Sequence, residues 1–127
     1  MKYNASERPV KMGTFSQYQA PEALHRYAEI ADLLNLGGKN DEEKLRRLIK
    51  KIDELKKDIE LPLTIQEAGI EEQAFLSALK EMSLAAFNDQ CTGTNPRYPL
   101  VSELEEIYLK AYYGEKKYEK MKEEEQL

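Results

Sequence analysis

Residues 41–59 read DEEKLRRLIKKIDELKKDI, and this stretch decides the fold class. Its apolar residues recur at spacings of three and four, which places them along one stripe of an α-helix. Asp41 is a suitable N-cap, and two glutamates follow it in the first turn, where the helix dipole favours negative charge. The stretch therefore predicts a long amphipathic helix. Its apolar stripe consists of Leu45, Leu48, Ile49, Ile52, Leu55 and Ile59.

Three further segments carry the same helical spacing. The first begins at Pro21-Glu22 and ends at Gly37-Gly38, since proline suits a first helical turn and glycine suits a helix end. The second ends at the turn around Cys91, and the third ends at Gly114. Capping boxes are predicted from Thr64 with Glu67 and from Ser102 with Glu105.

No segment shows the alternation of a β-strand, so the predicted class is all-α, a small antiparallel helical domain over residues 1–114. The first twenty residues have no persistent helical period and are expected to form an irregular lead-in. Residues 115–127 read EKKYEKMKEEEQL, which is mixed in sign and poor in apolar anchors. We expect this charged tail to be a frayed helix or disordered.

The composition restricts the possible partners of the chain. A net charge of −5 and an isoelectric point near 5.1 argue against nucleic acid, because such binders carry a basic stripe. A single cysteine cannot build a disulfide framework, and no apolar run approaches the length of a membrane span. The N-terminus has no apolar secretory core. The expected location is therefore the cytoplasm, with no nucleic acid and no membrane as partner.

The polar side of residues 41–59 allows more than one interpretation. It carries seven basic residues, which would suit a coiled-coil seam, a partner groove or a membrane surface. Acidic residues are interleaved among them at spacings of four, which is typical of a solvated helix face. The solvated face is the favoured interpretation.

The usual catalytic constellations are absent from the sequence. His25 is the only histidine and cannot supply a multi-histidine metal site, so we expect it to have a structural or surface role. No glycine-rich phosphate loop follows a strand. The acidic pairs Glu42-Glu43 and Glu71-Glu72 lie in first helical turns, where stabilisation of the helix dipole explains them without acid–base catalysis.

Residues 88–97 read NDQCTGTNPR and allow two interpretations. Glycine, asparagine and proline here break a helix and redirect the chain, which is a structural role. Alternatively, a thiol, two threonine hydroxyls, backbone N–H groups and Arg97 are suited to line a polar pocket or channel. Cys91 has no histidine nearby in sequence to act as a base, so the pattern does not predict a nucleophile.

The longer stretch NDQCTGTNPRYPL, residues 88–100, resembles the C-terminal signature of iron-dependent alcohol dehydrogenases. Four shorter stretches, FSQY at 15–18, RYAEIAD at 26–32, EAG at 67–69 and YYG at 112–114, resemble the alcohol dehydrogenase half of bifunctional acetaldehyde–alcohol dehydrogenases. The resemblance runs from about Tyr3 to Gly114, and the motifs occur in the same order.

The resemblance implies that the chain corresponds to the end of the all-helical subdomain of such an enzyme. In that family, Fe²⁺ and NAD are bound upstream of the matched part, so the chain itself is expected to bind no metal and no cofactor. The parent enzyme would convert acetyl-CoA through acetaldehyde to ethanol with NADH, by hydride transfer to a carbonyl polarised by iron. The resemblance further implies that Cys91, Thr92 and Gly93 line the substrate channel.

Two functional hypotheses follow. In the first, the chain is an enzyme fragment that is inactive alone, whose partner is the missing upstream part of the dehydrogenase domain, and which joins a homo-oligomer or filament through that parent. This hypothesis predicts exposed apolar surface. In the alternative, the chain is a stand-alone helical interaction or assembly module without catalytic activity. That hypothesis predicts that the apolar surface is covered.

Overall fold

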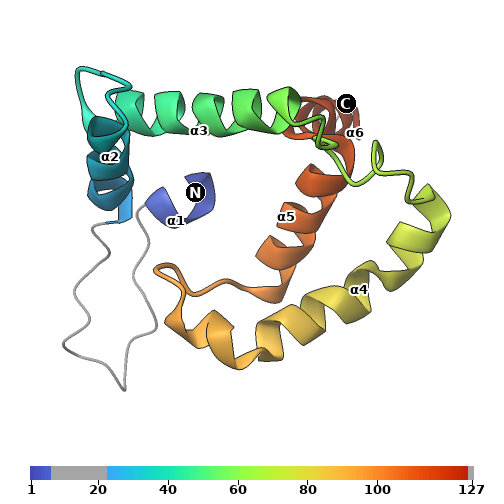
Figure 1. The fold of residues 1–127 in the computed structure, drawn as a ribbon. Helices are drawn as coiled ribbons and strands as arrows, with labels where there is room; N and C mark the ends of the chain where they lie inside the picture. The colour runs from blue at the N-terminus through green and yellow to red at the C-terminus, as the bar shows by residue number, and fades with distance from the viewer. Residues whose placement is uncertain (7–22, 126–127) are drawn as a thin grey trace. The chain divides into compact units, whose positions relative to one another are not determined.

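The computed structural model describes residues 1–6 and 23–125, which are helical and contain no strand (Figure 1). The predicted all-α class is thus confirmed for the described ranges. The expected helix start at Pro21-Glu22 and most of the expected lead-in lie outside them. No helix in these ranges is long and apolar enough to cross a bilayer. The elements are α1 (Lys2–Ala5), α2 (Ala23–Leu33), α3 (Asp41–Asp58), α4 (Glu72–Asn88), the 3₁₀ helix η1 (Gln90–Thr94), α5 (Val101–Tyr113) and α6 (Glu115–Glu125).

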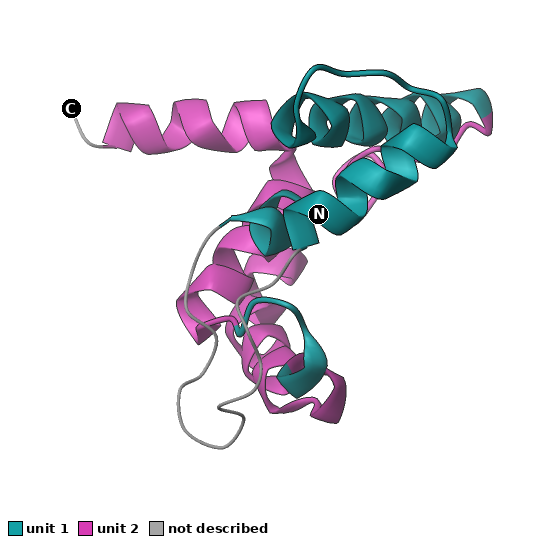
Figure 2. Cartoon of the chain, turned by 90° about the vertical axis from the view of Figure 1, so that its left-hand side faces the viewer, with its two compact units in different colours: residues 1–58, 93–98 teal, residues 59–92, 99–127 magenta. Residues whose placement is uncertain are grey.

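The chain forms two compact units, which are coloured separately in Figure 2. Unit 1 consists of Met1–Asp58 together with Gly93–Tyr98, and unit 2 consists of Ile59–Thr92 together with Pro99–Leu127. Each unit is described by itself below. The boundary inside η1 means that Cys91 and Thr92 belong to unit 2, whereas Gly93 belongs to unit 1.

The core of unit 1 lies between α2 and the N-terminal half of α3. Ala28 and Ala31 of α2 are buried, as are Leu45 and Leu48 of α3. An 11-residue helix is only about 16 Å long, so α2 cannot cover all of an 18-residue helix of about 27 Å. Accordingly, Figure 1 shows α2 beside the N-terminal end of α3, and Leu55 on the same apolar stripe is 55% exposed.

The end of α2 differs from the prediction. Asn35, and not Gly37-Gly38, occupies the left-handed position that stops the helix, with φ of 54°. The Leu36 N–H donates to the Ala31 carbonyl at 3.0 Å, and the Asn35 N–H donates to the Asp32 carbonyl at 2.9 Å. These two bonds form a Schellman motif, in which asparagine replaces the usual glycine because its short polar side chain tolerates positive φ.

Two helix starts also differ from the prediction. Asn40, and not Asp41, caps α3, because its Oδ1 accepts from the Glu43 N–H at 2.8 Å. At α5 the Leu100 N–H donates to the Glu103 carboxylate at 2.8 Å, two residues before the predicted box. In both cases an amphipathic pattern located the helix but could not fix its first residue.

An aromatic cluster forms the core of unit 2. The Phe75 ring of α4 stacks on the Tyr112 ring of α5 with centroids 4.3 Å apart, and Tyr113 meets Tyr112 edge to face at 4.8 Å. The Tyr112 hydroxyl donates to the Ile70 carbonyl at 2.9 Å, so the ring is buried without leaving its polar tip unpaired. The half-buried side chains around the cluster are Ile65, Leu79, Met82, Tyr108, Leu109 and Met121.

Residues 115–125, for which the sequence allows a frayed helix or a disordered tail, form the helix α6. Tyr118 of α6 is only 9% exposed and joins the aromatic cluster, and Met121 packs against the same cluster. Lys117, also on α6, donates from its Nζ to the Gln66 side-chain oxygen at 3.0 Å. Tyr118 and Met121 are one helical turn apart and therefore point to the same side of α6, which holds this charged helix on the aromatic cluster. The average composition of residues 115–127 does not show such a pair.

Candidate functional site

The candidate site is the loop that follows α4, because it carries Cys91, Thr92 and Gly93. Helix α4 ends at Asn88, and Asp89 then adopts an extended conformation. The Asp89 Oδ1 accepts from the Cys91 N–H at 2.7 Å, and the Asp89 carbonyl accepts from the Thr92 N–H at 3.1 Å. One aspartate therefore starts the 3₁₀ helix η1 through its side chain and its backbone.

A shallow, open groove of about 460 Å³ lies beside this loop in unit 2. Its wall is mainly apolar, while Asp89 and Thr92 supply polar atoms at one end. The Thr92 hydroxyl donates to the Ala86 carbonyl at the C-terminal end of α4, which holds this side chain in place. The groove is lined by Met82, Ala85, Ala86, Asp89, Thr92 and Tyr108.

The structure brings only one of the three predicted site residues into this groove. Thr92 lines it and is half-buried, whereas Cys91 is exposed and is not among the lining residues. Gly93 is also exposed, and a Cβ atom at its position would have no neighbour within 4 Å. The loop could accept a larger side chain at Gly93 without a clash inside unit 1.

Asn95 and Arg97 of the same sequence motif contact the N-terminal segment and do not line the groove. Asn95 pairs with the Asn4 side chain, and Arg97 lies against Tyr3 and Ser6 of the N-terminal segment. All of these residues belong to unit 1. Arg97 was one of the groups expected to line a polar pocket, and the structure places its guanidinium group on the chain's own N-terminal residues instead.

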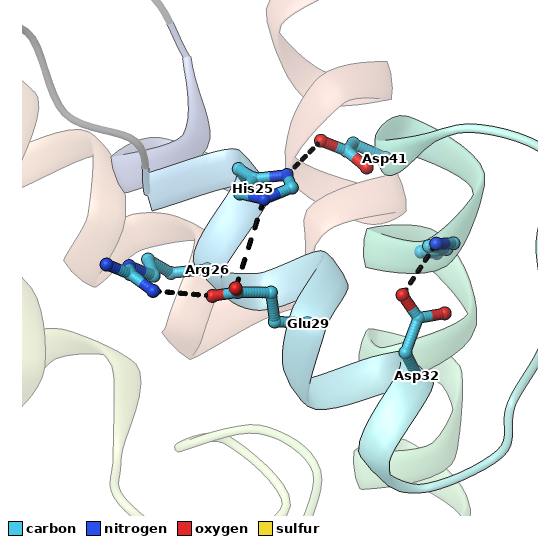
Figure 3. Close-up of polar contacts among 6 residues, drawn as sticks. His25, Arg26, Glu29, Asp32 and Asp41 are labelled. Atoms are coloured by element: carbon cyan, nitrogen blue, oxygen red, sulfur yellow. Dashed lines mark hydrogen bonds and ion pairs between the residues drawn. The ribbon is translucent and has the colours of Figure 1, made fainter.

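His25 belongs to an ion-pair network on the surface of unit 1 (Figure 3). Its Nδ1 lies 2.9 Å from the Asp41 carboxylate, and its Nε2 lies 3.9 Å from the Glu29 carboxylate. Arg26 contacts Glu29 at 2.8 Å. The network connects α2 to the start of α3, with the imidazole 60% exposed. This geometry agrees with a surface role for His25.

The donor set of the described residues does not fit an iron site. They contain no group of three histidine, cysteine or carboxylate side chains that could hold a metal ion. The two nitrogens of His25 face different carboxylates, so one ion could not be shared by all three groups. The described ranges also lack a strand followed by a glycine-rich turn, the usual cradle for a dinucleotide.

Sequence reasoning missed two contributors to this region. Asp89 organises η1, and Asn4 pairs with Asn95 although the two asparagines are 91 residues apart. An aspartate two residues before a turn is a recognisable Asx-turn signal, so Asp89 could have been found. No signal in a single sequence connects Asn4 to Asn95.

Comparison with known proteins gives a consistent match. The sequence model of a protein family, described as "Fe-containing alcohol dehydrogenase family, C-terminal", matches residues 4–112. Aldehyde-alcohol dehydrogenase of Clostridium acetobutylicum is 48% identical over 112 residues, which cover 88% of this chain and 13% of the relative. Bifunctional aldehyde-alcohol dehydrogenase of Escherichia coli K12 is 47% identical over 116 residues, covering 90% of this chain and 13% of the relative.

A more distant match is an enzyme with a different activity in its name. The NADPH-dependent butanol dehydrogenase of Clostridium saccharobutylicum is 38% identical over 98 residues, which cover 77% of this chain and 25% of that enzyme. The chain therefore spans about an eighth to a quarter of the length of these relatives, and the matching family model is the one for the C-terminal part of the family.

Proposed function

Because the chain belongs to the Fe-containing alcohol dehydrogenase family and is homologous to the C-terminal part of aldehyde-alcohol dehydrogenases, we propose that it acts as a helical component of such an enzyme. The parent would interconvert aldehyde and alcohol with a nicotinamide cofactor and iron. We assign Cys91, Thr92 and Gly93 to one wall of its substrate channel. The observation that carries the proposal is the match over residues 4–112 together with 47–48% identity.

The exposed apolar surface of α2 supports the proposal that another part of the parent enzyme packs against this helix. Ala28 and Ala31 are on the buried side of α2, while Ile30, Leu33 and the following residue Leu34 project from the other side. Their exposed fractions are 43%, 80% and 52%. A helix with apolar residues on two sides is normally covered on both, so we assign the second side to the upstream part of the dehydrogenase domain.

The donor set supports inactivity of the chain by itself. One histidine and one cysteine in the whole sequence cannot reproduce a multi-histidine iron site, so the isolated chain is expected to bind neither iron nor nicotinamide. We expect metal analysis of the purified chain to find far less than one iron per chain, with no NADH oxidation when acetaldehyde is added. Stoichiometric iron would contradict the proposal.

Gly93 allows a direct test of the channel wall. Its surroundings are open and its φ is not in the left-handed region, so Gly93→Leu should fold normally. In the natural polypeptide that contains this sequence, a leucine projecting into the channel should lower kcat/KM for acetaldehyde by about tenfold or more, by excluding substrate.

The matched control for this test is Ser102→Leu, at an exposed position of α5. It should leave kcat/KM for acetaldehyde unchanged. Equal kinetics in the Gly93→Leu and Ser102→Leu enzymes would remove the channel assignment and leave the family membership intact.

A second candidate function is the stand-alone helical module. The closed aromatic core of unit 2 favours it, because such a cluster can support independent folding. The mass of the natural polypeptide distinguishes the two functions. An immunoblot band several times larger than 14.7 kDa supports the enzyme component, and a band near 14.7 kDa supports the module.

A further inference from the structure

Asn4 and Asn95 form a reciprocal pair of amide hydrogen bonds. The Asn4 Nδ2 donates to the Asn95 Oδ1 at 3.0 Å, and the Asn95 Nδ2 donates to the Asn4 Oδ1 at 2.8 Å. If one amide were flipped, two N–H groups would face each other and two oxygens would face each other. Each side chain therefore fixes the orientation of the other.

The second N–H of each amide is also used. Asn95 donates to the Arg97 carbonyl within its own loop, and Asn4 donates to the Tyr27 hydroxyl of α2 at 3.4 Å. Both amides thus employ two donors and an acceptor in a half-buried position. The pair joins three separate parts of unit 1, namely α1, α2 and residues 93–98.

Arg97 adds a second attachment to the same N-terminal residues. The centre of its guanidinium group lies 4.1 Å from the centroid of the Tyr3 ring, within the range of a cation–π interaction. Its Nη1 donates to the Tyr3 carbonyl at 3.3 Å and also to the Ser6 hydroxyl. Residues 3–6 therefore present a ring, a carbonyl, an amide and a hydroxyl to Asn95 and Arg97.

The short helix α1 cannot hold this position without such contacts. It has four residues, none of them buried, and its start has no side-chain cap. Isolated helices of this length are unstable in water, because nucleation costs more than one turn of hydrogen bonds returns. The order of residues 3–6 must come from tertiary contacts, and those found in unit 1 converge on Asn95, Arg97 and Tyr27.

We propose that Asn95 and Arg97 are positioning residues that dock the N-terminal segment, residues 3–6, and that this docking sets the conformation of residues 93–98 within unit 1. The assignment goes beyond the proposed function, because it gives the second half of the NDQCTGTNPR motif a contact within the chain. It holds whether or not the loop lines a substrate channel.

Hydrogen–deuterium exchange of the full 127-residue chain, read by mass spectrometry, tests the coupling. Asn4→Ala removes one side of the amide pair from a helix that contributes nothing to the buried core. We expect amides of residues 93–98 to exchange about tenfold faster, since a half-buried polar group that loses its partner costs roughly that factor in the opening equilibrium. Exchange of the α5 amides should not change.

The double variant Asn4→Ala/Asn95→Ala should exchange no faster in residues 93–98 than Asn95→Ala alone, because the two side chains act as one unit. The control is Asn88→Ala, at an exposed position at the end of α4, which should match the natural chain. Additive effects of the two substitutions would overturn the pairing. Unchanged loop exchange in Asn4→Ala would overturn the docking itself.

Arg97→Lys gives an independent arm of the test. Lysine keeps the charge over the Tyr3 ring but loses the planar fork that reaches the carbonyl and the hydroxyl together. Loop exchange should therefore fall between those of the natural chain and Arg97→Ala. An Arg97→Lys chain that exchanges as fast as Arg97→Ala supports the fork as the essential contact, whereas equal exchange in all three chains contradicts a role for Arg97.

Discussion

Tyr113 is the residue whose chemistry the fold changes most. Its hydroxyl donates to the Glu72 carboxylate at 2.6 Å, and its side chain is 8% exposed. The hydrogen bond to Glu72, burial and the negative charge of Glu72 together raise the pKa of Tyr113 to about 12. Ionisation would break the hydrogen bond and place two negative charges side by side, so the phenol keeps its proton.

This pKa has a consequence for alkaline stability. The pKa of Tyr113 is higher in the folded chain than in the unfolded one, so the stabilisation is fully present below pH about 10 and is lost as the pH rises towards about 12. Tyrosinate absorbance during a pH titration, compared with Tyr113→Phe, isolates this phenol among the eight tyrosines.

Glu72→Gln gives the control for that titration. The pKa of Tyr113 should fall towards its ordinary value and stay above it, because burial still opposes ionisation. A Tyr113 that titrates as an ordinary tyrosine in the natural chain would mean that the bond to Glu72 does not form in solution.

The loop that follows α4 was predicted only in part from the sequence. The motif at residues 88–97 located a turn and its polar groups correctly, and Asp89 and Thr92 do organise it. The sequence could not show that Asn95 and Arg97 face residues 3–6, because that pairing depends on how the chain is folded back over a separation of 91 residues. The channel role of Cys91, Thr92 and Gly93 stays a prediction.

At the scale of elements, α6 is the clearest addition to the sequence-based picture. It begins at Glu115, after the last residue matched by the family model, and its attachment depends on Tyr118. Helix α5 ends at Gly114 with φ of 83°, a conformation that glycine adopts without strain, and this residue turns the chain into α6.

Removal of the Tyr118 ring should release α6. We expect Tyr118→Ala to lower the free energy of unfolding by about 2–4 kcal/mol, because a nearly buried aromatic ring leaves a cavity in the cluster. An 11-residue charged helix without its anchor is marginal in water, so amides of residues 115–125 should lose protection from hydrogen exchange.

Lys120→Ala is the matched control on the same helix, at an exposed position. It should change the free energy of unfolding by no more than about 0.5 kcal/mol. Protection of residues 115–125 that persists in Tyr118→Ala would show that contacts other than the ring hold α6.

For the whole molecule, the feature without an assigned contact is the apolar surface that α2 leaves exposed among the described residues. Leu33 of α2 is 80% exposed, with Ile30 on the same helix and Leu34 directly after its end. We expect the isolated chain to self-associate at high concentration through this face, because water is displaced most easily from such neighbouring apolar side chains. Sedimentation velocity over a range of concentrations measures the association.

Leu33→Glu should shift the isolated chain towards monomer by weakening the association about tenfold or more, as a buried carboxylate would have no partner. Gln73→Glu adds the same charge at an exposed position of α4 and should leave the association unchanged. Equal association in both variants would mean that net charge, and not the α2 face, controls self-association.

The family, the all-α class and the approximate extent of each long helix follow from the sequence, because they depend on local motifs and on a period of about 3.6 residues that burial of one helix face imposes. Three further features became visible only in the folded chain: Tyr118 anchors residues 115–125 as a helix, half of the α3 stripe stays uncovered by α2, and Asn4 pairs with Asn95. These outcomes depend on which surfaces meet in space, and a pattern of neighbours along the chain does not contain that information.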